Sequence, residues 1–208
     1  MPVIEYFYSA HSAFAYLGSA RFMEIAKATG RRIDHRPNDL RRVVQECGAI
    51  AFPARTAAHV AYFFGREIER WSEERQAPVM DGTPTYHSND IRLPNCMLIA
   101  GLLDGQNVDA LAHGMLESHW RDDADLADED TLAHIATATG YQPAPLLDQA
   151  LSDEVIKVYE KNTEEAVARS VFGSPTYFVD GDMFYGQDRL EIMERALHTP
   201  YQGTWPRD

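Results

Sequence analysis

The sequence predicts an α/β fold in which strands near both ends of the chain flank a long helical middle. Three observations indicate this arrangement. Residues 3–8 are rich in β-branched and aromatic side chains, and apolar residues recur at helical spacing from Ala13 onward. Strand-like patterns are almost absent between Asp39 and Arg169. An apolar strand, a hairpin turn and a second short strand follow after residue 170.

The first strand, Val3–Tyr8, leads through a short polar break into a helix that ends at Gly30. Ser12 stands directly before this helix, where a hydroxyl can accept hydrogen bonds from free backbone N–H groups. A helix N-terminus also favours a bound anion. Ser12 therefore has two interpretations, a simple helix cap or a member of an anion site.

The second strand is predicted over Arg32–Pro37, and we expect His35 on this strand to face solvent. The helical middle contains an apolar stripe that includes Phe63, Phe64 and Trp71, which we expect to belong to the core. Caps, glycines, prolines and apolar spacing predict helices over residues 39–45 (ended by Gly48), 53–75 (opened by Pro53), 93–104, 107–120, 131–139, 143–151 and 153–169.

The C-terminal part begins with a Gly173-Ser174-Pro175-Thr176 turn that runs into an apolar strand. Asp180-Gly181 is typical of a hairpin turn, and a short strand over residues 182–185 follows it. Gly186-Gln187-Asp188-Arg189-Leu190 then opens the last helix. Asp188 can be a plain cap of that helix or a ligand-binding carboxylate.

Composition limits the classes of partner. The 208 residues carry a formal net charge of −13, which argues against nucleic acid and anionic membrane surfaces as main partners. No apolar run is long enough to span a bilayer, and the N-terminus lacks the pattern of a signal peptide. Cys47 and Cys96 lie far apart without a C-x-x-C motif, so we expect a cytoplasmic, reducing location. The histidines lack metal-ligand spacing, and we expect no metal site.

Three blocks of sequence carry a resemblance to a known family: residues 12–17, 172–176 and 186–190. With them the chain resembles the DsbA-like branch of thioredoxin-like proteins that contains 2-hydroxychromene-2-carboxylate isomerases and kappa-class glutathione transferases. The likeness covers nearly the whole chain. It implies a thioredoxin-like fold with an all-helical insertion, in which residues 1–38 and 170–208 form the thioredoxin-like domain and residues 39–169 form the insertion.

The resemblance also implies a chemistry. Ser12 and Ala15 occupy the positions of the two redox cysteines of the family, and this pair cannot cycle between dithiol and disulfide. A helix N-terminus with a hydroxyl instead suits an external thiolate, and the resemblance implies glutathione. By the same likeness, Ser12 steadies the thiolate, Ser174 and a cis Pro175 pair with the cysteinyl part, and Gln187 and Asp188 hold the γ-glutamyl end.

The expected function is glutathione-dependent isomerisation of an aromatic degradation intermediate, such as 2-hydroxychromene-2-carboxylate to trans-o-hydroxybenzylidenepyruvate, by a homodimer. The alternatives are a kappa-like glutathione transferase and a redox-inactive DsbA-like module that binds extended peptides. The chain departs from the family at Ala49, His59 and Val60, where residues that contact glutathione usually stand.

Overall fold

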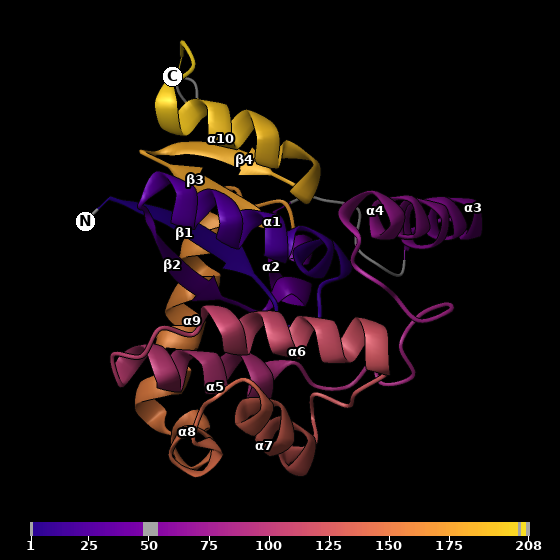
Figure 1. Ribbon diagram of the computed structural model, residues 1–208, viewed down its shortest axis with the longest axis vertical. Helices are drawn as coiled ribbons and strands as arrows, with labels where there is room; N and C mark the ends of the chain where they lie inside the picture. Colours follow the sequence, from indigo (N-terminus) through magenta and orange to yellow (C-terminus); the bar gives the residue numbers. More distant parts are fainter. Residues whose placement is uncertain (1, 48–53, 204, 207–208) are drawn as a thin grey trace.

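The computed structural model describes residues 2–47, 54–203 and 205–206. The predicted helix end at Gly48, the departure from the family at Ala49 and the predicted helix start at Pro53 lie outside these ranges. A four-stranded sheet in the order β2-β1-β3-β4 forms the centre of one half of the molecule (Figure 1). Its strands are β1 (Val3–Tyr8), β2 (Arg32–Pro37), β3 (Thr176–Val179) and β4 (Asp182–Tyr185).

The pairing of the strands follows from their connections. β1 runs parallel to β2, so the chain must cross over between them, and helix α1 (Ala13–Thr29) makes that crossover. β1 and β3 are antiparallel, as are β3 and β4. Asp180 and Gly181 both have positive φ, as a two-residue hairpin with the twist of its strands requires, which confirms the predicted hairpin.

The sheet is covered on both faces because alternate residues of β1 point to opposite sides. Tyr6 belongs to the large core that includes α1 and α10 (Leu190–His198), and its ring stacks on Tyr8 at 4.0 Å between centroids. Phe7 points the other way, into a smaller cluster with Val43 and Ala166. These two residues come from α2 (Leu40–Glu46) and α9 (Asp153–Ala168).

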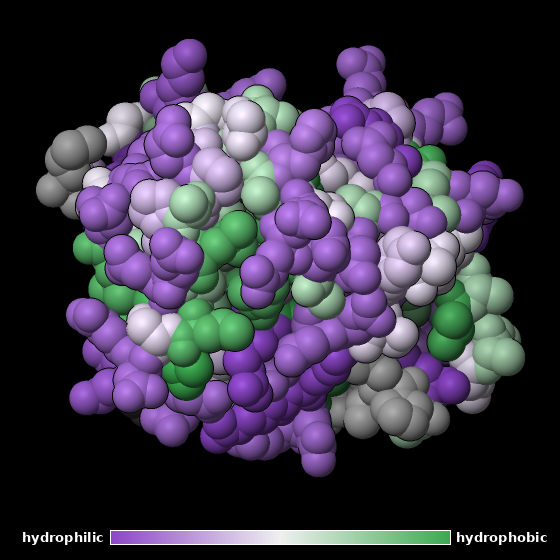
Figure 2. Space-filling model, turned by 90° about the horizontal axis from the view of Figure 1, so that it is seen from below, coloured by the Kyte–Doolittle hydropathy of each residue, from purple (hydrophilic) through white to green (hydrophobic). Residues whose placement is uncertain are grey.

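A group of helices lies beside the sheet, below it in Figure 1. It comprises α5 (Arg92–Leu103), α6 (Asp109–Asp122), α7 (Glu129–Ala138) and α8 (Pro143–Ala150), with α9 leading back to the sheet. The helices predicted for this part of the chain are confirmed, with ends that differ by one or two residues. The face that is turned downward in Figure 1 is mostly hydrophilic, with apolar groups between the polar ones (Figure 2), which fits the net charge of −13.

The predicted helix over residues 53–75 is broken into three pieces: α3 (Ala57–Val60), a π-helix, η2 (Ala61–Arg66), and α4 (Glu67–Arg75). This arm extends to the side of the molecule in Figure 1. The prediction that its apolar stripe is core rather than pocket is confirmed only in part. Phe64 and Trp71 are half-buried and pack against the core, but Phe63, Phe64 and Trp71 also line pockets. In α4, Ile68 is fully buried in the core and Trp71 packs against it half-buried, because the arm meets the body along one side only.

The prediction that His35 faces solvent is also wrong. His35 is 5% exposed. Its Nδ1 lies 2.9 Å from the Tyr8 hydroxyl, and its Nε2 lies 2.8 Å from Oδ1 of Asp109. Asp109 is the first residue of α6, so the start of that helix covers β2 at His35. The alternating pattern of β2 alone does not indicate that another segment covers it. Among the described helices, none is both long and apolar enough to cross a membrane.

Candidate active site

The end of β1 and the start of α1 meet the turn before β3, which lies far away in the sequence. The Ser12 hydroxyl accepts a hydrogen bond from the Ala15 N–H at 3.3 Å, which confirms its role as a helix cap. The same hydroxyl donates to the Ser174 carbonyl oxygen at 3.2 Å. The Ser9 N–H donates in turn to the Ser174 Oγ at 3.3 Å. The Ser174–Pro175 bond is cis, as expected.

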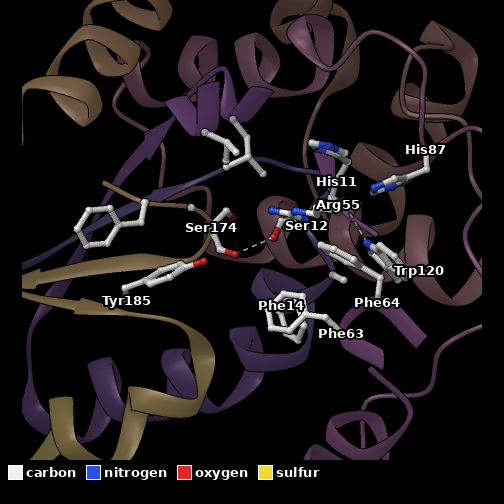
Figure 3. Close-up of a pocket in the computed structure, with 15 residues that line it drawn as sticks. His11, Ser12, Phe14, Arg55, Phe63, Phe64, His87, Trp120, Ser174 and Tyr185 are labelled. Atoms are coloured by element: carbon white, nitrogen blue, oxygen red, sulfur yellow. Dashed lines mark hydrogen bonds between the residues drawn. The ribbon is translucent and has the colours of Figure 1, made fainter. Parts of the chain in front are cut away.

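A pocket opens at this junction (Figure 3). It holds about 530 Å³ of empty space, including the open solvent at its mouth. Its walls are largely aromatic, and its polar groups are few and clustered near Ser12. The residues labelled around it in Figure 3 are His11, Ser12, Phe14, Arg55, Phe63, Phe64, His87, Trp120, Ser174 and Tyr185.

A second pocket adjoins the first and shares four residues with it: Phe14, Phe63, Ser174 and Tyr185. Gln187 and Asp188 line this second pocket. The structure therefore places Ser12 in the first pocket, Ser174 in both, and the two residues of the last turn in the second. Pro175 lines neither, and its carbonyl oxygen accepts a hydrogen bond from the Gly186 N–H at 2.9 Å.

Gln187 is held inside the protein, with 1% of its surface exposed. Its side-chain oxygen accepts from Nε of Arg75 at 3.1 Å, and its backbone oxygen accepts from the same guanidinium at 3.2 Å. Within the described residues its side-chain nitrogen has no hydrogen-bond partner. Gln187 thus lines the second pocket while its amide oxygen is bonded to Arg75. This contact joins α4 to the turn before α10.

Asp188 makes no capping hydrogen bond to the helix that follows it. Its carboxylate accepts from Nη1 of Arg189 at 2.6 Å and folds back over Gly186. Gly186 has φ +102, which strains any residue with a side chain, and a Cβ there would also collide with that carboxylate. The plain helix-cap interpretation of Asp188 is therefore wrong, and its role toward a ligand stays a prediction.

Three histidines gather beside Ser12, and the sequence analysis did not group them. His11 and His87 line the pocket, with ring centroids 4.9 Å apart. His119 lies behind His87, and its Nε2 is 3.0 Å from Nδ1 of His87. Residues 11, 87 and 119 follow no local spacing, so only the folded chain brings them together. Their hydrophobic neighbour Trp120 donates its indole N–H to the His11 carbonyl oxygen at 2.8 Å.

Burial keeps these imidazoles neutral. It lowers the pKa of His87 to about 4, helped by the nearby His119 and Arg41. The pKa of His11 is lowered well below its usual value, again mainly by burial, and that of His119 is lowered for the same reason. The Arg55 guanidinium, 4.8 Å from the centre of the Phe64 ring, brings a positive charge to the pocket wall.

The site holds no redox pair of its own. Cys96 is buried, with a pKa raised by burial to about 12, and Cys47 is half-buried; neither lines the pockets described above. The described residues also contain no group of three or more His, Cys, Asp or Glu side chains arranged to hold a metal ion. The Ser12 hydroxyl is bonded to backbone atoms rather than to an imidazole, so Ser12 is not part of a Ser–His nucleophile pair.

This architecture defines a thioredoxin-like protein whose active turn lacks thiols. The chain belongs to the DSBA-like thioredoxin domain family, whose model matches residues 3–198. It is 25% identical to a 2-hydroxychromene-2-carboxylate isomerase from Pseudomonas sp. (strain C18), over 94% of this chain and 90% of the relative. It is also 25% identical to the isomerase of the same name from Sphingobium xenophagum, over 93% and 97% of the two chains.

Among solved structures, a 2-hydroxychromene-2-carboxylate isomerase superposes with a TM-score of 0.77 at 22% identity, covering 94% of each chain. This likeness confirms the predicted DsbA-like fold. Of the departures noted in the sequence, His59 stacks on Phe63 with 5.5 Å between ring centroids, and Val60 is 43% exposed. Neither lines the pockets that contain Ser12 and Asp188.

Proposed function

We propose that this protein isomerises 2-hydroxychromene-2-carboxylate, or a related intermediate of aromatic degradation, with glutathione as cofactor. One observation carries the proposal: a hydroxyl at a helix N-terminus, Ser12, faces the turn at Ser174 in an aromatic pocket that has no thiol. A hydroxyl at a helix N-terminus suits a thiolate brought in from outside, and neither cysteine of the chain lines this pocket. The names of the relatives support the same reaction.

Glutathione fits the two adjoining pockets as one elongated ligand. Its thiol would lie at Ser12, its cysteinyl backbone along Ser174, and its γ-glutamyl end in the second pocket. There the Asp188 carboxylate could accept hydrogen bonds from the α-ammonium group. The Ser12 hydroxyl, which now donates to the Ser174 carbonyl, would turn its hydrogen toward the sulfur when the thiolate is present.

The reaction needs only the thiolate as nucleophile. Once the hemiketal ring of the chromene has opened to the ketone and the phenol, the sulfur adds to the carbon–carbon double bond conjugated with that ketone, and the electron pair moves to the ketone oxygen as an enolate. The former double bond is now single and rotates. The enolate then re-forms the double bond in the trans geometry and expels the thiolate, so that glutathione is regenerated. Phe63, Phe64 and Trp120 offer faces for the aromatic ring, and Arg55 offers a charge complementary to the substrate carboxylate.

Calorimetry with reduced glutathione, followed by an isomerisation assay with 2-hydroxychromene-2-carboxylate, tests the proposal. We expect glutathione to bind and the trans product to form only when it is present. Formation of a stable glutathione adduct with an electrophilic aromatic compound, without isomerisation, would point to a kappa-like transferase instead. Binding of an extended peptide without either activity would point to the DsbA-like peptide-binding module.

The setting proposed for this activity is the cytoplasm, where glutathione is kept reduced. We also propose a homodimer. Analytical ultracentrifugation at micromolar concentration would test it, and a single sedimenting species of 23.5 kDa would contradict it.

A further inference from the structure

The three histidines beside Ser12 form a directed chain of hydrogen bonds. The Ala124 carbonyl oxygen, 2.9 Å from Nδ1 of His119, can only accept, so that Nδ1 must carry a hydrogen. A neutral His119 then has a bare Nε2, which must accept from Nδ1 of His87 at 3.0 Å. A neutral His87 consequently has its lone pair on Nε2. The chain of bonds selects one tautomer of His87.

The lone pair on Nε2 of His87 can accept a proton or a hydrogen bond from a ligand bound in the pocket. His87 lines the pocket that contains Ser12, whereas His119 is 1% exposed and lies behind it. Figure 3 shows the His87 ring beside His11 and Trp120 at the edge of the pocket. Around it lie His11, His119, Trp120 and Arg41, which donates to the His87 carbonyl oxygen. None of these four described neighbours is a carboxylate. Asp123 and Asp125 act on His119 behind His87, and burial, His119 and Arg41 all lower the pKa of His87 itself.

The proposed substrate requires a proton transfer that the thiolate does not perform. 2-Hydroxychromene-2-carboxylate is a cyclic hemiketal, and its ring must open to give the ketone and the phenol. The hydroxyl O–H bond breaks, the C=O bond forms, and the ring C–O bond breaks with its electron pair going to the aryl oxygen. That oxygen then takes up a proton. One proton moves between two oxygens that share a carbon atom, so a single base can take it and return it.

We propose that Nε2 of His87 accepts the proton of the hemiketal hydroxyl and returns it to the aryl oxygen, with His119 as the positioning residue. This inference rests on the proposed function. The anions brought by substrate and cofactor, a carboxylate and a thiolate, stabilise the imidazolium that forms briefly on His87. His119 acts through His87: its bare Nε2 keeps the hydrogen on Nδ1 of His87 and keeps Nε2 free, as the third member of a catalytic triad orients its histidine.

Replacement of His87 is the first test. In the presence of saturating glutathione, His87→Ala should lower kcat for ring opening by about 10²- to 10⁴-fold, the usual share of general acid–base catalysis. The Kd for glutathione should stay unchanged, and added imidazole should restore kcat in proportion to its concentration. His113→Ala is the matched control, because this half-buried histidine bonds to Ser19, 2.6 Å away, and does not line the pocket; it should keep the parent kcat.

A second variant separates the positioning role from packing. His119→Phe fills the same space but accepts no hydrogen bond, so it should lower kcat while KM stays near the parent value. ¹⁵N NMR of the parent protein should show His87 with a hydrogen on Nδ1 and none on Nε2, and His119→Phe should produce a mixture of tautomers. This spectroscopic readout requires neither activity nor substrate.

Several results would overturn the inference. Parent-like kcat in His87→Ala would do so while leaving the proposed function intact, and so would a loss of kcat that imidazole does not restore. A hydrogen on Nε2 of His87 in the parent spectrum would also overturn it, and this measurement decides the matter if the alanine variant fails to fold. A parent protein that neither binds glutathione nor opens the ring would remove the proposed function and this inference with it.

Discussion

The protein contains two buried networks of hydrogen-bonded histidines. We call a network closed where the histidine uses both ring nitrogens and open where it uses only one. In the network of β2, His35 uses both ring nitrogens, one with the Tyr8 hydroxyl and the other with Asp109. In the pocket network, His87 uses one nitrogen with His119 and leaves the other without a partner among the described residues. A closed network joins elements of the fold, here the sheet and α6. An open network leaves a polar group available to a ligand. We therefore expect substitutions in the closed network to lower stability and substitutions in the open network to lower activity.

Breaking the closed network should have the largest effect on stability. His35→Ala removes a buried ring and leaves the Tyr8 hydroxyl buried without a partner, which should lower the free energy of unfolding by about 3–5 kcal/mol. Urea unfolding measures the loss. The activity of the remaining folded molecules should match that of the parent, since His35 lies outside the pocket. A folded, fully stable variant without activity would contradict the division.

Acid should destabilise the protein through the open network. The pKa of His87 is about 4 in the folded protein, against a usual value near 6.5, so the unfolded chain binds more protons between these values. Stability is therefore fully present above pH 6.5 and falls as the pH decreases toward 4, by an amount on the order of 3 kcal/mol. His11 and His119, which face His87, have lowered pKa values and contribute in the same direction.

Unfolding midpoints in urea at pH 7, 6, 5 and 4 would reveal this dependence. His87→Gln keeps a polar side chain of similar size without a titrating group, so its stability should change less over the same range. A parallel decline in parent and variant would assign the acid sensitivity to other groups.

Ser12 tests the other polar group of the open pocket. Ser12→Ala removes one hydrogen bond to the proposed thiolate, which should cost roughly 1.5–3 kcal/mol and raise the pKa of bound glutathione by about one to two units. Glutathione should still bind, while thiolate absorbance near neutral pH and most of the activity are lost, with partial recovery at higher pH. If the bound thiol titrates as in the parent and turnover is equal, Ser12 is a helix cap alone.

Asp188 should have the smallest effect of these changes, because its carboxylate is half-exposed and already paired with Arg189. Asp188→Asn should weaken glutathione binding by about 1.5 kcal/mol, the lower end for a hydrogen bond to a charged group. Calorimetry measures the change, and Glu194→Gln, on α10 outside both pockets, is the control. Unchanged affinity in folded Asp188→Asn would remove Asp188 from the binding site.

Local sequence patterns by themselves determined the order of strands and helices, the cap at Ser12 and the absence of a redox pair in the active turn. These features depend on neighbouring residues: alternation, helical spacing, a hydroxyl before a helix, and the identity of residues 12 and 15. The blocks around Ser12, Ser174 and Gln187 were therefore recognisable in the sequence, and the fold that they imply is the one observed.

Only the tertiary structure decided which side chains are buried and which face the pocket. His35 became buried because α6 covers β2, and Phe63 and Phe64 became pocket walls because their helix meets the body along one side. His11, His87 and His119 come from three separate segments, and nothing in their spacing signals that they meet. Burial and proximity arise from packing between distant segments, and the free ring nitrogen of His87 is a consequence of that packing rather than of any local pattern.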